Sequence, residues 1–144
     1  MPELVDVPAL ATLVVPAVTD WSRFPGEWGG LLDEVWACLR AAGVTSGCRN
    51  VMLYLDDRPA VEIGVLAAQP CEPTGRVVRS SLPAGRVVRA VHYGGYDGLG
   101  ATHEAIHQWA GEQGVALSRT RWEVYGPHDD DPSRVWTEVS WLQA

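Results

Sequence analysis

The sequence predicts an α+β fold in which two β-α-β-β units are related by a pseudo-twofold axis. Two helices would pack on antiparallel sheets, with a ligand cleft between the halves. The same order of strand-like alternation and helical spacing occurs in each half of the chain, about residues 5–68 and 76–142. A polar connector with proline and glycine separates the halves at 69–75. The 144 residues are expected to form a single domain.

The first half begins with an apolar run from Val5 to Val18. Its prolines predict a strand with an irregular start, because proline cannot donate a hydrogen bond within a ladder. Apolar residues at helical spacing from Leu31 to Ala42 predict a helix that ends at Gly43. Two alternating segments, 51–55 and 60–67, flank the turn DDRP and predict a hairpin.

The second half repeats this order with little residue identity. A strand is predicted from Gly85 to His92, followed by the turn YGGYDG and a helix over about 99–113 that ends at Gly114. A second hairpin is predicted within Arg121 to Trp141, with the longer loop PHDDDPS. The two halves therefore have matching elements.

Alternation along the two hairpins predicts which side chains face the core. The predicted core face carries Val51, Leu53, Leu55, Val61, Ile63, Val65, Trp122, Val124, Val135, Thr137, Val139 and Trp141. The predicted free face carries Met52, Tyr54, Glu62, Glu123, Tyr125, Trp136 and Glu138. The free faces are expected to line a cleft with an acidic floor and aromatic walls. A register shift of one residue would invert this assignment, because successive side chains of a strand point to opposite faces.

The composition excludes several classes of partner. The net charge is −7 and the pI is about 4.9, whereas nucleic-acid and anionic-membrane binding need clustered positive charge. We therefore expect no direct contact with nucleic acid and no membrane association. The N-terminal apolar run lacks a preceding basic segment, which predicts a cytoplasmic protein. No cofactor is expected.

Three segments resemble the GyrI-like small-molecule-binding domain, also called the AraC-type effector-binding domain. They are VHYGGY (Val91 to Tyr96) before the second helix, then EVYGP and TEVSW near the end. The resemblance covers nearly the whole chain. It implies that lipophilic, often cationic aromatic compounds are held against a glutamate near the last strand, and Glu138 matches that glutamate. Tyr125 matches an aromatic position of the family, and the family's H-x-G-x-Y turn is matched by His92, Gly94 and Tyr96.

The resemblance and the pattern together predict a stand-alone, multidrug-type binding protein. A carboxylate partly removed from water favours a cationic guest, and aromatic rings attract cations as well. The expected ligand-binding residues are Glu138, Tyr125, Trp136, Tyr54, Trp21, Tyr96, Met52 and Glu62. The alternative is an enzyme, since some stand-alone members are similar to hydrolases that open cyclopropane-bearing DNA-alkylating compounds. Glu138 would then be the catalytic base for water.

A third alternative arises from the segment HEAIH. His103, Glu104 and His107 form a literal H-E-x-x-H, the helical zinc motif in which the glutamate acts as a base. The predicted helix places these histidines on a face that looks into the core, and no further zinc-protease pattern follows. We therefore interpret the motif as a coincidence and expect no metal site, with a zinc hydrolase as the third alternative.

Overall fold

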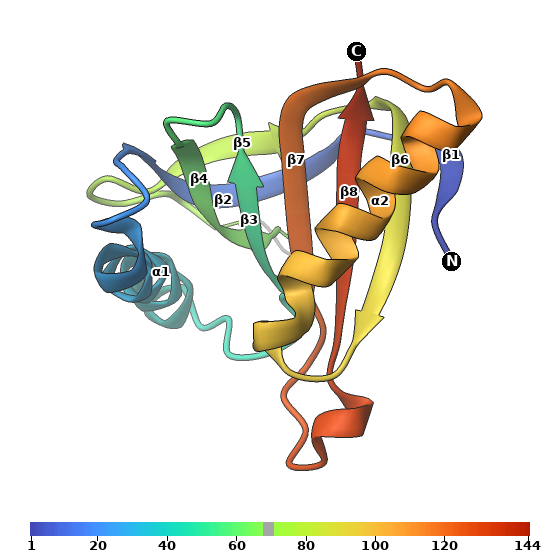
Figure 1. Ribbon diagram of the computed structural model, residues 1–144. Coiled ribbons are helices and arrows are strands. Elements are labelled where there is room, and N and C mark those ends of the chain that lie inside the picture. Colours follow the sequence, from blue (N-terminus) through green and yellow to red (C-terminus); the bar gives the residue numbers. More distant parts are fainter. Residues whose placement is uncertain (68–70) are drawn as a thin grey trace.

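The computed structural model describes residues 1–67 and 71–144. Residues 68–70, which include the end of the first predicted half and the start of the predicted connector, lie outside the described residues. The described chain contains eight strands and two α-helices (Figure 1). The strands are β1 (Glu3–Val7), β2 (Leu10–Val18), β3 (Asn50–Tyr54), β4 (Ala60–Leu66), β5 (Val78–Leu82), β6 (Gly85–Tyr93), β7 (Leu117–Tyr125) and β8 (Trp136–Gln143). The helices are α1 (Phe24–Ala41) and α2 (Leu99–Gln113), with short 3-10 turns at Tyr96–Gly98 and Pro132–Arg134.

The strands of the described chain form one antiparallel sheet in the order β1-β6-β8-β7-β3-β4-β2-β5. The central pair is β3 and β7, and each is followed outward by its hairpin partner. The predicted α+β class and both hairpins are confirmed. The pseudo-twofold relation of the halves stays a prediction.

Both helices cover the same face of this sheet. Helix α1 packs on β2 and β4 through a core that includes Leu13, Val35 and Ile63. Helix α2 packs on β6 and β8, where Ile106 contacts the cluster of Val88 and Val139. The helices therefore lie over the outer strands of each half, on either side of the central pair (Figure 1).

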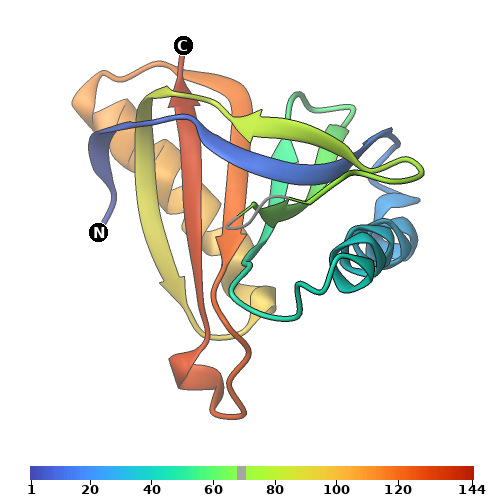
Figure 2. The ribbon, with the colours of Figure 1, turned by 180° about the vertical axis from the view of Figure 1, so that it is seen from behind.

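The opposite face of the central strands forms a second core. It contains Val51, Leu53, Leu82, Val87, Trp122 and Val124, all buried. Seen from behind, β2 and β5 run steeply across the direction of β6 and β8, so the bent sheet covers this core itself (Figure 2). Gly64 allows the bend, because a Cβ there would lie 1.8 Å from the carbonyl oxygen of Leu13.

The hairpin registers differ from the prediction. Leu53 lies opposite Glu62, and Val124 lies opposite Glu138, so these glutamates share the back face with apolar residues. Met52 and Tyr54 instead lie opposite Ile63 and Val61 on the helix-covered face. The predicted core and free faces of β4 and β8 are therefore wrong by one residue. The reason is that β3 and β7 are buried on both faces, so apolar residues occupy successive positions rather than alternate ones.

Three other elements depart from the prediction. The apolar run Val5–Val18 is divided into β1 and β2, and β5 was not predicted. Helix α1 begins at Phe24 rather than Leu31, because Asp20 organises the turn before it. The Asp20 carboxylate accepts bonds from Ser22 and Arg23, which hold its pKa at about 2. Helix α2 agrees with the prediction and ends at Gly114, whose φ of 70° is left-handed.

Candidate functional site

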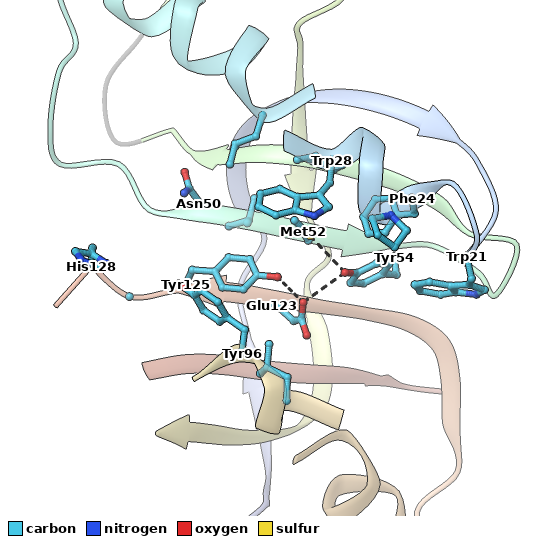
Figure 3. Close-up of a pocket in the computed structure, with 16 residues that line it drawn as sticks. Trp21, Phe24, Trp28, Asn50, Met52, Tyr54, Tyr96, Glu123, Tyr125 and His128 are labelled. Atoms are coloured by element: carbon cyan, nitrogen blue, oxygen red, sulfur yellow. Dashed lines mark hydrogen bonds between the residues drawn. The ribbon is translucent and has the colours of Figure 1, made fainter. Parts of the chain in front are cut away.

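A pocket of about 510 Å³ opens between the two helices, above the central strands (Figure 3). Its floor comes from β3 and β7, one wall from α1 and the turn before it, and the other wall from the start of α2. The lining residues are Trp21, Phe24, Pro25, Trp28, Leu32, Asn50, Val51, Met52, Tyr54, Ile63, Tyr96, Leu99, Glu123, Tyr125, Gly126 and His128. Pockets of this volume and apolar character accommodate drug-sized ligands.

Aromatic rings form the walls at both ends. Trp21, Phe24 and Tyr54 make a cluster with ring centroids 5.7–6.0 Å apart. At the other end, the ring of Tyr96 meets that of Tyr125 edge to face at 5.7 Å. Trp21, Trp28 and Tyr96 remain 40–57% exposed, so wide aromatic surface is available at the mouth.

Glu123 supplies the charge in the pocket floor. It is 5% exposed and lies between Trp122 and Val124 on the central strand β7. The hydroxyl of Tyr125 donates to its Oε1 at 2.5 Å, and the hydroxyl of Tyr54 lies 3.4 Å from the same oxygen (Figure 3). His103 Nε2 lies 2.8 Å from its Oε2. Within the described part of the chain, no arginine nitrogen lies within 4.0 Å of this carboxylate.

The two tyrosines act as permanent donors. Burial, followed by the neighbouring Glu123 carboxylate, raises the pKa of Tyr54 and of Tyr125 far above that of a free phenol. Both hydroxyls therefore keep their protons at any physiological pH. A carboxylate that accepts bonds from phenols and an imidazole has its hydrogen-bonding needs met while its negative charge is retained.

A buried cation, Arg121, lies on the same strand and face as Glu123 but has other partners. Its Nη1 donates to the carboxylate of Asp57 at 3.0 Å and to the carbonyls of Asp56 and Arg119. Its guanidinium also lies over the rings of Trp21, Tyr54 and Trp141, at 5.1–5.8 Å from their centroids. The charge of Arg121 is thus directed toward the β3–β4 turn.

The structure brings together five of the residues predicted to bind ligand. Tyr125, Tyr54, Trp21, Tyr96 and Met52 all line the pocket. Their roles in binding remain predictions.

Three residues that were predicted to bind ligand lie outside the pocket. Glu138 is on the back face, where its carboxylate is 4.0 Å from Arg89. Glu62, also on the back face, accepts a hydrogen bond from Ser80. Trp136 packs against Gly126 with the guanidinium of Arg49 5.0 Å from its ring. Their predicted place in the cleft is wrong because of the register of the two hairpins.

Several lining residues were absent from the predicted ligand-binding set. Glu123 was predicted to line the cleft but was not named as a binding residue, and Phe24 and Leu99 were not considered as wall residues. A usable signal was present, since a glutamate between tryptophan and valine in a central strand is surrounded by core. Such a carboxylate requires specific partners.

The HEAIH segment lies on α2, where His103 and Ile106 turn toward the sheet. Glu104 and His107 are exposed, so the prediction that both histidines look into the core is wrong for His107. Both ring nitrogens of His103 have partners, Glu123 on one side and the indole of Trp141 on the other. The ring of His107 packs against Trp141 at a centroid distance of 4.2 Å. Nowhere in the described chain do three histidine, cysteine or acidic side chains come together as a set of metal ligands.

Neither helix of the described chain is long and apolar enough to cross a membrane.

Comparisons with known proteins give a fold but no family. The sequence matches no protein-family model and no curated protein sequence. Among solved structures, the C-terminal domain of EcmrR is 20% identical, with a TM-score of 0.75 over 100% of this chain and 97% of that domain. In an EcmrR–DNA complex the identity is 21% and the TM-score 0.76, over 99% of this chain. The match there spans only 57% of the EcmrR chain.

Two other solved structures have the same architecture. SAV2435, solved bound to tetraphenylphosphonium, is 12% identical, with a TM-score of 0.68 over 100% of this chain and 94% of that one. A hydrolase from Listeria innocua is 14% identical, with a TM-score of 0.67 over 99% and 91% of the two chains. The chain therefore shares its fold with the EcmrR C-terminal domain, with SAV2435 and with the Listeria hydrolase.

Proposed function

We propose that this chain is a GyrI-like small-molecule-binding protein that takes lipophilic cations into the pocket between α1 and α2. Glu123, rather than Glu138, supplies the negative charge, and the rings of Trp21, Tyr54 and Tyr125 supply the stacking surface. The shared fold with SAV2435, which was solved with tetraphenylphosphonium, supports this class of ligand.

The observation that carries the proposal is a buried carboxylate in an aromatic pocket. Its partners in the described chain are phenol hydroxyls and an imidazole rather than a lysine or arginine, so its field extends into the cavity when the imidazole is neutral. A cation near it gains Coulombic energy that is larger in a low-dielectric site than in water. Each ring that a cation contacts adds about 0.5–2 kcal/mol. A neutral guest of the same shape would gain only the apolar contacts.

The test uses two ions of the same shape and opposite charge, tetraphenylphosphonium and tetraphenylborate. Binding is measured by calorimetry and by quenching of tryptophan fluorescence. The native protein is expected to bind the phosphonium and to reject the borate. Glu123→Gln should weaken phosphonium binding by about 1–3 kcal/mol. The variant should fold, because the amide can present its oxygen to His103 and its nitrogen to the tyrosine hydroxyls, which also accept.

Glu138→Gln is the matched control, since it removes the same charge from the opposite face of the sheet. Its phosphonium affinity should equal that of the native protein. Loss of binding in Glu138→Gln, with Glu123→Gln unaffected, would contradict the assignment of the site. Absence of phosphonium binding by the native protein would contradict the function itself.

Hydrolysis is the second candidate, favoured by the hydrolase of the same fold and by the phenols that flank Glu123. In such an enzyme the carboxylate would take a proton from water as the water oxygen bonds to a cyclopropane carbon and a ring C–C bond breaks. The same proton would then pass to the anion that the ring opening releases. Incubation with a cyclopropane-bearing alkylating compound would give a product heavier by one water. Mass spectrometry that recovers every such compound intact would count against this candidate and leave the binding protein.

A further inference from the structure

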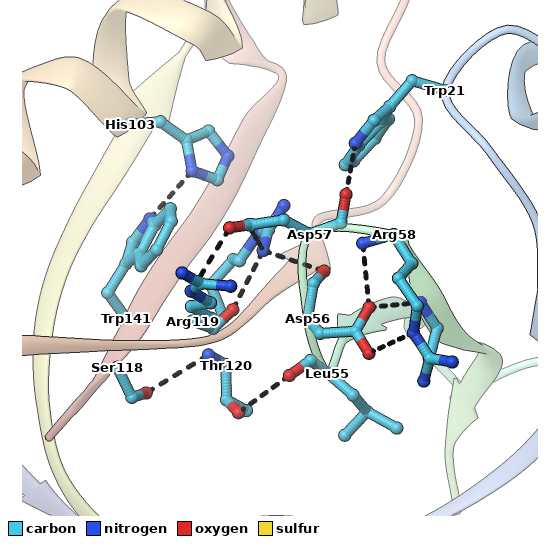
Figure 4. A network of polar contacts seen from close by, with 12 residues as sticks. Trp21, Leu55, Asp56, Asp57, Arg58, His103, Ser118, Arg119, Thr120 and Trp141 are labelled. Atoms are coloured by element: carbon cyan, nitrogen blue, oxygen red, sulfur yellow. Dashed lines mark hydrogen bonds and ion pairs between the residues drawn. The ribbon is translucent and has the colours of Figure 1, made fainter.

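His103 on α2 makes hydrogen bonds to two strands of the sheet, to Glu123 on β7 and to Trp141 on β8. Its Nδ1 is 2.9 Å from the indole Nε1 of Trp141, and its Nε2 is 2.8 Å from Glu123 (Figure 4 shows the indole bond). An indole nitrogen can only donate, so Nδ1 must be unprotonated to accept. The proton of a neutral ring is therefore on Nε2, from which it donates to the carboxylate. These contacts fix the tautomer of the neutral ring.

We propose that His103 is a positioning residue that makes cation binding at Glu123 depend on pH, a proposal that rests on the function proposed above. In its neutral form, His103 orients the carboxylate and leaves the negative charge unopposed. A second proton on Nδ1 turns the ring into an imidazolium that pairs with Glu123 and breaks the bond from Trp141. A proton on His103 and a cation in the pocket therefore oppose each other.

The surrounding groups determine the direction of this effect. Glu123 on β7 lies 2.8 Å from His103, with Arg121 on the same strand and His107 one turn away on α2. The hydroxyls of Tyr54 and Tyr125 on the far side of the carboxylate remain neutral. Asp57, in the β3–β4 turn, is engaged by Arg121. The loss of the indole bond is specific to the charged ring, since Trp141 cannot accept a hydrogen bond there.

The sign follows from linkage. If a second proton on His103 weakens cation binding, a bound cation must weaken proton binding at His103 by the same factor. The affinity for the cation therefore rises with pH until His103 is fully neutral. Histidine is the side chain that ordinarily changes charge between about pH 5 and 8. Tetraphenylphosphonium has a permanent charge that does not titrate. Any pH dependence of its binding in this range therefore comes from the protein.

The chain offers a close mimic of the neutral ring. In His103→Gln the amide oxygen can accept from Trp141 while the amide nitrogen donates to Glu123, but the side chain cannot be protonated. His103→Leu removes both bonds. His107→Gln is the control, because His107 lies one turn away, contacts the same indole and does not bond to Glu123. Burial, followed by His103, lowers the pKa of His107.

Binding of tetraphenylphosphonium is measured for each variant at intervals between about pH 8 and pH 5. The native protein and His107→Gln should lose about tenfold or more in affinity as the pH falls, because the positive charge on His103 then repels the positive charge of the bound phosphonium. His103→Gln should bind like the native protein at high pH and show a flat profile. His103→Leu should bind weakly at every pH.

The outcome that overturns the inference is a native protein that binds the cation with the same pH profile as His103→Gln. A native protein that does not bind the cation at all contradicts the proposed function instead, so the two failures are distinguishable. Nitrogen NMR of the ring provides a readout without ligand. At high pH the spectrum should show His103 protonated at Nε2 only. A ring that carries its proton on Nδ1 at that pH would equally refute the inference.

Discussion

Glu123 and Glu138 lie on adjacent strands but on opposite faces of the sheet, and they differ in almost every physical respect. Glu123 is 5% exposed, and its partners are tyrosine hydroxyls and an imidazole. The side chain of Glu138 is 34% exposed, and its partner is the guanidinium of Arg89. The first carboxylate keeps an unopposed charge where water is scarce, whereas the second is paired and screened by solvent. The role of a glutamate therefore depends on the face of the sheet on which it lies as well as on its residue type.

The two faces differ in packing for a related reason. Behind the central strands, the bent sheet folds over its own side chains and fills the space with a core around Trp122 and Val124. In front of them, α1 and α2 cover the outer strands of each half. The central pair is left without a helix above it, and the uncovered area is the pocket. The cavity is thus a consequence of helix spacing.

The largest effect is expected from Trp122→Ala on the back face. The side chain is 4% exposed within the second core, and loss of a buried tryptophan leaves a cavity that the rigid sheet cannot close. The free energy of unfolding should fall by about 3–5 kcal/mol. Urea denaturation followed by circular dichroism measures this value.

Trp28→Ala is the front-face counterpart, because Trp28 is 40% exposed at the mouth of the pocket. Its stability should change by less than about 1 kcal/mol. Its affinity for tetraphenylphosphonium should fall instead, since an aromatic wall is lost. Equal destabilisation by both substitutions would show that the pocket face is as tightly packed as the back.

An intermediate effect is expected from Tyr125→Phe. This change removes a hydrogen bond to a buried carboxylate and leaves part of the charge unsolvated. The cost should be about 1–3 kcal/mol of stability. The same substitution at Tyr93, which is 69% exposed, should cost close to nothing. Denaturation midpoints of the two variants provide the comparison, and similar values would mean that Glu123 draws little stabilisation from the phenol.

The elements were predictable from the sequence where local signals agree. Helix α2 has helical spacing, and Gly114 adopts the left-handed conformation that its place after the helix predicted. The hairpins were predictable for the same reason, since turn residues flank their strands. The start of α1 was missed because Asp20 orders that turn through its side chain, which apolar spacing does not reveal.

The facing of the side chains required knowledge that the sequence does not contain. In β7–β8 odd-numbered residues pair with odd-numbered ones, as Glu123 does with Val139. In β3–β4 even-numbered residues pair with odd-numbered ones, as Met52 does with Ile63. Adding or removing one residue in the hairpin loop changes one of these pairings into the other, and so changes which side chains share a face. In amphipathic strands the alternation of apolar and polar residues would show which register is correct. Both faces of β3 and β7 are buried, so the apolar residues of these strands were compatible with either register.

The smallest effect is expected from Glu138→Gln, and it tests whether the back-face glutamate has any special environment. Its oxygen is 4.0 Å from Arg89, which has a second partner in Glu3, and both side chains remain about one-third exposed. Exposed pairs of this kind contribute about 0–1 kcal/mol, and Glu3 can still neutralise the arginine after the change. Unfolding in urea should therefore differ from the native protein by less than about 0.5 kcal/mol, and by less still at high salt. A loss of several kcal/mol would mean that Glu138 is held as specifically as Glu123, and the contrast between the two faces would then have to rest on packing alone.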